Sequence, residues 1–224
     1  KPVQRDAPAL SAKTLMPQYQ NSHLVHLLQG GQDFFPALVR DIDAAHHEIW
    51  LETYIYSMDE SGVQVAQALV RAAGRGVKVR VVMVGAGTPA LPLEWAARFD
   101  TAGVQWRIFS PLGRIGWFIP SRWRRLHRKL CMVDGVVAYC GGINILDDFY
   151  DPNHGALESP RFDFAVRVKG PLVRDVAQAM SQFWWRLQAV RQMRGTDFAS
   201  AWAALQAAVR SLPAEVAAVP GGTR

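Results

Sequence analysis

The stretch that decides the fold reads Leu126-His127-Arg128-Lys129-Leu130-Cys131-Met132-Val133-Asp134-Gly135 and continues Val136-Val137-Ala138-Tyr139-Cys140-Gly141-Gly142-Ile143-Asn144. Its two apolar runs flank an Asp-Gly pair, the strongest short-range signal of a β-hairpin. With the turn at that pair, the sequence predicts that Val133 pairs with Val136, Cys131 with Ala138, Lys129 with Cys140 and His127 with Gly142. Because strand side chains alternate between faces, we expect one face at one end of the ribbon to carry His127, Lys129, Gly142 and Asn144.

Such a face suits a phosphodiester. Lys129 offers a positive charge and Asn144 an amide donor, and both groups stabilise charge on phosphoryl oxygens. His127 is the side chain of this group that can attack phosphorus or transfer a proton near neutral pH. Each of these residues alone is more often a solvated surface residue, and Asp134-Gly135 alone is more often a plain turn. The shared face is what favours a functional cluster.

The same residues carry a family resemblance. His127-x-Lys129-x-x-x-x-Asp134, followed by Gly141-Gly142-x-Asn144, resembles the HxKxxxxD signature of the phospholipase D superfamily. Blocks at 51–55, 75–79, 103–104 and 163–171 resemble bacterial cardiolipin synthases in the same order, especially the B-type branch, and the resemblance covers about residues 20–190. The chain holds one motif copy, so it resembles the N-terminal half of such a protein. Gly142 stands where many superfamily members carry Ser, and Val84 stands where close relatives often carry Asp.

The resemblance implies a covalent mechanism. One histidine attacks phosphorus and forms a phosphohistidine, and a second histidine, from a second motif copy, protonates the leaving alcohol. His127, Lys129 and Asp134 are then the catalytic motif, with His127 as the nucleophile or as its acid–base partner. Lys129, Asn144 and Gly142 would bind the substrate phosphate. No cofactor is implied.

Three carboxylates need separate interpretation. The resemblance implies that Asp163 orients the histidine by holding its other ring nitrogen, as a triad carboxylate does. Without the resemblance, the sequence would equally well indicate an ordinary Asp at the start of a strand. The hairpin argument gives Asp134 a structural role in the turn. Glu52 falls in an apolar run typical of a central strand, where a carboxylate needs a partner. It therefore either lines the site or is a satisfied structural residue.

Composition limits the partners. The 224 residues are 50% apolar, enough for a sizeable core, and 25 basic against 19 acidic side chains give a net charge of +6, which favours anionic partners. Charges interrupt every long apolar run, so the sequence predicts no transmembrane helix. Cys131 and Cys140 are expected to lie diagonally on one face of the hairpin as free thiols. No Cys/His spacing indicates a metal site.

A basic and aromatic segment precedes His127. We expect it to form a lipid interface in which aromatic rings sit at the membrane boundary and arginines meet phosphates. The same mixture could stack bases and grip a nucleic-acid backbone, or be a packed loop with a solvated basic edge. The residues are Trp117, Phe118, Trp123, Arg122, Arg124 and Arg125.

Periodicity predicts an α/β fold. Helical stripes at 34–45, 63–73 and 91–102 alternate with β-rich runs at 48–56, 77–84 and 104–109, an order typical of a parallel sheet with crossover helices. The hairpin and a run at 162–168 should extend this mostly parallel sheet, and the resemblance implies a phospholipase D-like α-β-α sandwich with a mixed sheet and helices on both faces. A long helix should follow Pro171. The expected organisation is an arm at 1–20, a catalytic domain at 21–195, and a helix and linker at 196–224 toward a second half.

The resemblance implies a phosphatidyltransferase of the cardiolipin synthase type, which would act on phosphatidylglycerol as a peripheral protein at the cytoplasmic face of the bacterial inner membrane. The second motif copy would come from the same chain or from a homodimer mate. The alternatives are a single-motif endonuclease that acts on nucleic acid as a homodimer, and a non-catalytic half-domain that binds anionic membranes.

Overall fold

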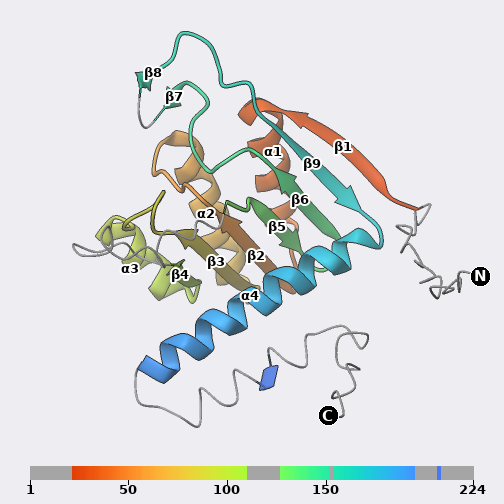
Figure 1. The fold of residues 1–224 in the computed structure, drawn as a ribbon, viewed down its shortest axis with the longest axis vertical. Coiled ribbons are helices and arrows are strands. Elements are labelled where there is room, and N and C mark those ends of the chain that lie inside the picture. The colour runs from red at the N-terminus through yellow and green to blue at the C-terminus, as the bar shows by residue number, and fades with distance from the viewer. Residues whose placement is uncertain (1–21, 110–126, 152–153, 195–205, 208–224) are drawn as a thin grey trace, which may run out of the picture.

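The computed structural model describes residues 22–109, 127–151, 154–194 and 206–207 (Figure 1). The predicted arm at 1–20 and nearly all of the predicted helix and linker at 196–224 lie outside these residues. A seven-stranded sheet forms the centre, in the order β1-β9-β6-β5-β2-β3-β4. Its strands are β1 (Leu24–Gln29), β2 (Glu48–Thr53), β3 (Lys78–Val84), β4 (Gln105–Phe109), β5 (Leu130–Val133), β6 (Val137–Gly141) and β9 (Phe164–Lys169). A separate pair is formed by β7 (Tyr150–Asp151) and β8 (Gly155–Ala156).

Helices cover both faces of the sheet, which confirms the predicted α/β sandwich. The helices α1 (Gly30–Asp43), α2 (Glu60–Gly74) and α3 (Leu93–Ala102) pack on one face, and α4 (Leu172–Arg194) crosses the other (Figure 1). The larger core, on the first face, centres on residues such as Leu38, Leu69 and Val81, which are fully buried. On the second face Val173, Met180 and Trp184 of α4 pack against Trp50 and Met132, and α4 itself confirms the long helix predicted after Pro171. Within the described residues, no helix combines the length and apolarity that crossing a bilayer demands.

Parallel pairing is more limited than the sequence predicted. Of the six pairings within the described sheet, β2–β3 and β3–β4 are parallel and the other four are antiparallel. The parallel part follows from the two crossover helices, α2 and α3, which return the chain to the same end of the sheet each time. The antiparallel part follows from the hairpin and from β1, a strand that the sequence analysis did not identify. β1 pairs with β9 at the sheet edge.

The hairpin forms where predicted, but the predicted register is wrong by one residue. Val133 pairs with Val137 and Cys131 with Tyr139, because Val136 lies outside the ladder as an extra residue. Asp134 and Gly135 both adopt positive φ, of 53° and 66°, and the Val136 N–H donates to the Val133 carbonyl at 3.0 Å. The prediction that Cys131 and Cys140 share one face of the hairpin is therefore wrong. Cys131 faces the first core and Cys140 faces the second, and both are free thiols, as predicted.

Asp134 does more than form the turn. Its carboxylate accepts hydrogen bonds from the backbone N–H groups of His46, His47 and Glu48, at 2.8, 2.8 and 2.9 Å. These bonds tie the hairpin to the start of β2, at the end of β5 opposite to His127. Partial burial raises the pKa of Asp134, but the three N–H donors and the charge of His47 outweigh it and lower the pKa below its usual value. The position of Asp134 therefore fits the predicted structural role in the turn. Although Asp134 belongs to the same motif as His127, the two residues lie at opposite ends of β5.

We expect Asp134→Asn to lower the free energy of unfolding by about 1–2 kcal/mol at pH 7, because one charged acceptor of backbone N–H groups is lost. Asn tolerates the left-handed backbone, so the turn itself is spared. Because the pKa of Asp134 is lower in the folded protein than the unfolded value of 3.8, the carboxylate stabilises the fold at pH values above 3.8. This stability is lost as the pH falls through the folded pKa, so the unfolding free energies of the variant and the wild type should converge in acid. Urea unfolding at pH 7 and pH 3 measures this. Equal stability at pH 7 would show that these bonds contribute nothing.

Candidate active site

The candidate site lies at one end of the sheet, where four segments meet. β2 runs antiparallel to β5, with Glu52 opposite Leu130, so the residues that follow β2 lie beside those that precede β5. β6 ends at Gly141, whose partner Ala165 lies near the start of β9. The chain therefore brings four segments to the same end of the sheet, although they are as many as 109 positions apart in sequence: Tyr54, His127–Lys129, Gly142–Asn144 and Asp163.

His127 and Lys129 are in direct contact. The Lys129 Nζ lies 3.0 Å from Nδ1 and 3.1 Å from Nε2 of the imidazole, and 3.4 Å from the His127 carbonyl oxygen. Tyr54 adds an aromatic wall: its ring centroid lies 4.8 Å from that of His127 and 5.5 Å from the Lys129 Nζ. Lys129 is buried, whereas His127 is exposed. A fixed ammonium thus stands beneath an accessible imidazole.

Asp163 lies next to this pair, and Gly142 makes room for it. A Cβ atom at position 142 would stand 2.0 Å from the Asp163 Oδ1, so any side chain at this position would displace the carboxylate. The carboxylate also accepts the Phe164 N–H at 2.9 Å, which fixes its direction. The glycine that the sequence analysis assigned to phosphate binding therefore has a steric reason to be glycine.

Asn144 is held by the segment after β2. Its Oδ1 accepts the Ile55 N–H at 3.0 Å, and its side chain is largely buried. Because the carbonyl of the amide is occupied in this way, the NH₂ group is the part of Asn144 that can donate to a phosphoryl oxygen. Among the described residues, no group of three or more His, Cys, Asp or Glu side chains is arranged to hold a metal ion.

The electrostatics favour a neutral imidazole. Desolvation lowers the pKa of His127, the positive charge of Lys129 lowers it further, and Asp163 opposes both. Desolvation also lowers the pKa of Lys129, again against the charge of Asp163. A histidine whose pKa lies below its usual value is deprotonated at neutral pH and can act as a nucleophile or a base.

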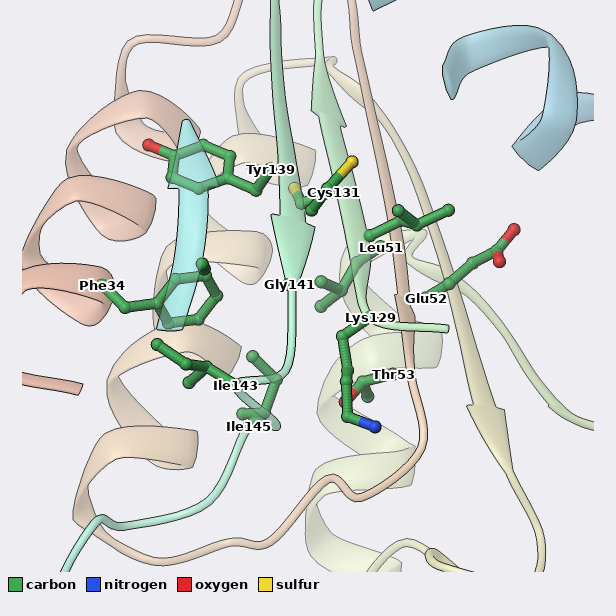
Figure 2. A pocket seen from close by; sticks show the side chains of 13 residues that line it. Phe34, Leu51, Glu52, Thr53, Lys129, Cys131, Tyr139, Gly141, Ile143 and Ile145 are labelled. Atoms are coloured by element: carbon green, nitrogen blue, oxygen red, sulfur yellow. The ribbon is translucent and has the colours of Figure 1, made fainter. Parts of the chain in front are cut away.

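Glu52 lies on the other face of the sheet. It shares that face with Trp50 and Leu130, beneath α4, and Figure 2 shows its side chain leaving the strand in a different direction from Lys129. Its Oε2 lies 2.8 Å from the Arg128 Nη2, and the Arg128 guanidinium stacks on Phe183 of α4, 5.1 Å from the ring centroid. Burial raises the pKa of Glu52 to about 7, although Arg128 lowers it. Glu52 is thus the buried partner of Arg128, the residue that lies between His127 and Lys129 in the sequence.

The structure brings His127 and Lys129 into contact, with Gly142 against Asp163 and Asn144 against Ile55 at the same end of the sheet, but not through the predicted register. With the corrected register, Lys129 lies opposite Gly141, whose N–H donates to the Lys129 carbonyl at 3.3 Å, and Gly142 and Asn144 reach the site from the loop after β6. Sequence reasoning missed Tyr54 and Arg128. An aromatic ring directly after a buried strand and an arginine inside the motif were the available signals. The predicted lipid-interface residues all fall at 110–126, outside the described residues: Trp117, Phe118, Trp123, Arg122, Arg124 and Arg125.

We expect the charges around His127 to act on its titration in opposite directions. Lys129→Gln should raise the pKa of His127, because a neighbouring positive charge is removed, and Asp163→Asn should lower it further, because a negative charge is removed. Proton NMR of the imidazole as a function of pH measures both shifts. Lys78→Gln, at the start of β3 away from the site, is the control and should leave the titration unchanged. Shifts of the same sign in both site variants would contradict the arrangement.

Glu52 should make stability depend on pH. Its folded pKa of about 7 lies above the usual 4.5, so the stability it confers is full below 4.5 and is lost as the pH rises through 7. We expect Glu52→Gln to reduce the loss of unfolding free energy between pH 5 and pH 8 by on the order of 2 kcal/mol. The slope is the measured quantity, since Gln also leaves Arg128 without a counter-charge. Glu94→Gln, on the surface of α3, should keep the wild-type slope. An unchanged slope in Glu52→Gln would mean that this carboxylate titrates normally.

Comparison with known proteins identifies related sequences and folds. The family model described as "Cardiolipin synthase, PLD-like domain" matches residues 38–184. Cardiolipin synthase B of Escherichia coli K12 is 34% identical over 179 residues, which cover 75% of this chain and 42% of that protein. Cardiolipin synthase C of the same strain is 36% identical over 167 residues, covering 70% and 34%. The chain therefore spans less than half the length of either relative.

Two solved structures share the fold. Nuc from Salmonella typhimurium, a phospholipase D family member, superposes with a TM-score of 0.52 at 18% identity, over 73% of this chain and 95% of that chain. NucT from Helicobacter pylori superposes with a TM-score of 0.52 at 12% identity, over 73% and 94%. At these identities the likeness concerns the fold alone.

Proposed function

The chain belongs to the family of phospholipase D-like domains of cardiolipin synthase, and from this membership and the geometry of its site we propose that the protein is a phosphatidyltransferase of the cardiolipin synthase type. The observation that carries the proposal is the contact of His127 with Lys129 beside Asp163, with Asn144 held at the same edge. An imidazole kept neutral, an ammonium and an amide donor together suit attack on a phosphodiester and stabilisation of its oxygens.

The reaction has two displacements at phosphorus. In the first, a ring nitrogen of His127 forms a bond to the phosphorus of one phosphatidylglycerol, and the bond to the glycerol oxygen breaks; the oxygen takes a proton and leaves as glycerol. In the second, a hydroxyl of another phosphatidylglycerol attacks the phosphohistidine, loses its proton and restores the imidazole. Lys129 and Asn144 hold the phosphoryl oxygens in both steps, and Asp163 orients the imidazole. If His127 is instead the acid–base partner, the same bonds form at the other motif copy.

A second proton-transfer group is needed, because a histidine bound to phosphorus cannot also protonate the leaving alcohol. We assign this role to a second HxKxxxxD copy, in the same chain or in a homodimer mate. The net charge of +6 and the basic, aromatic segment before His127 support work at an anionic membrane surface, as a peripheral protein on the cytoplasmic side of a bacterial inner membrane.

The test uses the protein at its full natural length with phosphatidylglycerol in mixed micelles. We expect cardiolipin and glycerol to appear in equal amounts, and His127→Ala to lower the rate by at least about a thousandfold, because no other group described here replaces the nucleophile. Lys78→Gln is the control for a substitution remote from the site. Circular dichroism should show that His127→Ala keeps the fold.

Other outcomes separate the rival functions. Cleavage of DNA or RNA without lipid transfer would favour the dimeric endonuclease. Binding to anionic liposomes with no turnover of either substrate would favour the non-catalytic half-domain. Unchanged cardiolipin formation by His127→Ala would remove this histidine from the mechanism. Size-exclusion chromatography of the 224-residue chain shows whether it dimerises by itself.

A further inference from the structure

The segment that carries His127 and Lys129 lies at the limit of the sheet. β5 begins at Leu130, and its pairing with both β2 and β6 begins at that residue. One further bond extends the pairing, from the Gly141 N–H to the Lys129 carbonyl at 3.3 Å. His127 and Arg128 come before these paired residues, so the direction of the imidazole depends on side-chain contacts.

Arg128 is held on the far face of the sheet by two different elements. Its Nη2 lies 2.8 Å from Oε2 of Glu52 in β2, a carboxylate whose side chain is 4% exposed. Its guanidinium lies over the ring of Phe183 in α4, 5.1 Å from the centroid. Phe183 is itself held by an edge-to-face contact with Phe109 of β4, with 5.2 Å between the ring centroids. The guanidinium therefore has a charged partner on a strand and an aromatic partner on a helix.

These contacts act on His127 and Lys129 through the backbone. Contacts alternate in direction along the segment, with Arg128 under α4 and its two neighbours on the other face, as side chains do in an extended chain. On that face the Lys129 Nζ lies 3.0 Å from the imidazole, and the Tyr54 ring centroid lies 4.8 Å from that of His127. A rotation of the segment that took the imidazole away from Tyr54 would therefore also pull the guanidinium from its two partners.

Arg80 of β3 provides a comparison on the same face of the sheet. Its Nη1 lies 3.5 Å from Oε2 of Glu48, and its guanidinium lies 4.5 Å from the Trp50 ring centroid. Its side chain is 16% exposed, against 33% for Arg128. Arg80 thus has the same kinds of partner as Arg128, but it pairs with Trp50, nearer the end of the sheet opposite to His127.

Stability alone does not account for the pair of Glu52 and Arg128. Burial raises the pKa of Glu52 to about 7 although Arg128 lowers it, so the loss of hydration outweighs the attraction between the two charges. Apolar residues of similar volume often give equal or greater stability than a buried ion pair. The best-attested use of a buried ion pair is to fix one register. At this position the register decides whether Lys129 or Arg128 faces the site.

We propose that Arg128 is a positioning residue that keeps His127 in place from the opposite face of the sheet. Its grip on Glu52 and Phe183 holds the imidazole against the Tyr54 ring. Arg128 acts through the backbone and not on the reacting phosphate, and α4 thereby supports the site from the far side of the sheet. The effect on phosphatidyl transfer rests on the proposed function, whereas the placement of the imidazole does not.

The placement is tested by NMR on the 224-residue chain. In the wild type the rings of His127 and Tyr54 are close enough for a nuclear Overhauser effect between their protons. We expect Arg128→Gln to lose this effect, because Gln has neither the charge nor the planar, stacking fork of Arg. Glu52→Leu should lose it too, because Arg128 then has no charged partner on β2 and can turn its partly exposed guanidinium to solvent.

Arg80→Gln is the matched control. It removes an arginine with the same kinds of partner from the same face, so a merely structural role would make the two arginine substitutions act alike. We expect Arg80→Gln to keep the ring contact, even where urea unfolding shows an equal loss of stability. Glu52→Leu keeps the test decisive if Arg128→Gln fails to fold, since an apolar residue in place of a buried charge is often tolerated. A ring contact kept in both site variants, or lost equally in Arg80→Gln, would overturn the proposal.

The effect on the reaction is tested with the full-length protein and phosphatidylglycerol in mixed micelles. We expect Arg128→Gln to lower kcat by about a hundredfold, the cost of misplacing a reacting group by about 1 Å. KM should stay within about twofold, because Arg128 does not bind the substrate, and Arg80→Gln should keep both constants within about twofold. An unchanged kcat in Arg128→Gln, while the wild type makes cardiolipin, would overturn the positioning role and leave the proposed function intact. Loss of the ring contact in Arg128→Gln, in a protein that makes no cardiolipin, would support the placement and refute the proposed function.

Discussion

The antiparallel pairing of β2 with β5 is the contact on which the site depends. β2 belongs to the parallel half of the sheet and β5 to the antiparallel half, and the register with Glu52 opposite Leu130 joins the two. It sets the carboxyl end of β2 beside the amino end of β5, so that Tyr54 meets His127 and Ile55 meets Asn144. A slip of one residue would exchange the faces of Lys129 and Arg128 and place the ammonium under α4.

The charged residues directly before β5 lie on opposite faces of the sheet and have different partners. On one face Lys129 supports the exposed imidazole beside Asp163; on the other Arg128 neutralises the buried Glu52 and stacks on α4. Alternation along the strand keeps the second positive charge away from the imidazole, although it is adjacent in sequence. Buried charges require partners, and Glu52 meets this requirement for Arg128 without drawing on the carboxylate of Asp163.

How much of this could be predicted from the sequence depends on the range of the interaction. Local patterns predicted the α/β class, the three helices of the first layer, α4 and the hairpin, because each follows from apolar periodicity and one turn signal. The register failed because one residue, Val136, leaves the ladder, a choice between turn geometries that the same Asp-Gly pair allows. β1 was missed because its apolar residues do not alternate with polar ones. Leu28 is the one buried residue of this strand, which lies at the sheet edge and pairs with β9.

The residues that crowd the site could not be predicted by pattern at all. That Gly142 must be glycine follows from the position of Asp163, 21 residues later, and no local rule links the two. The same holds for Asp148 and Arg161, which close over the start of α1 from a different segment. The loops after β6 thus make two kinds of contact at one edge of the sheet. Gly142 leaves room for the Asp163 carboxylate beside His127 and Lys129, and Asp148 accepts the Gly31 N–H at the start of α1.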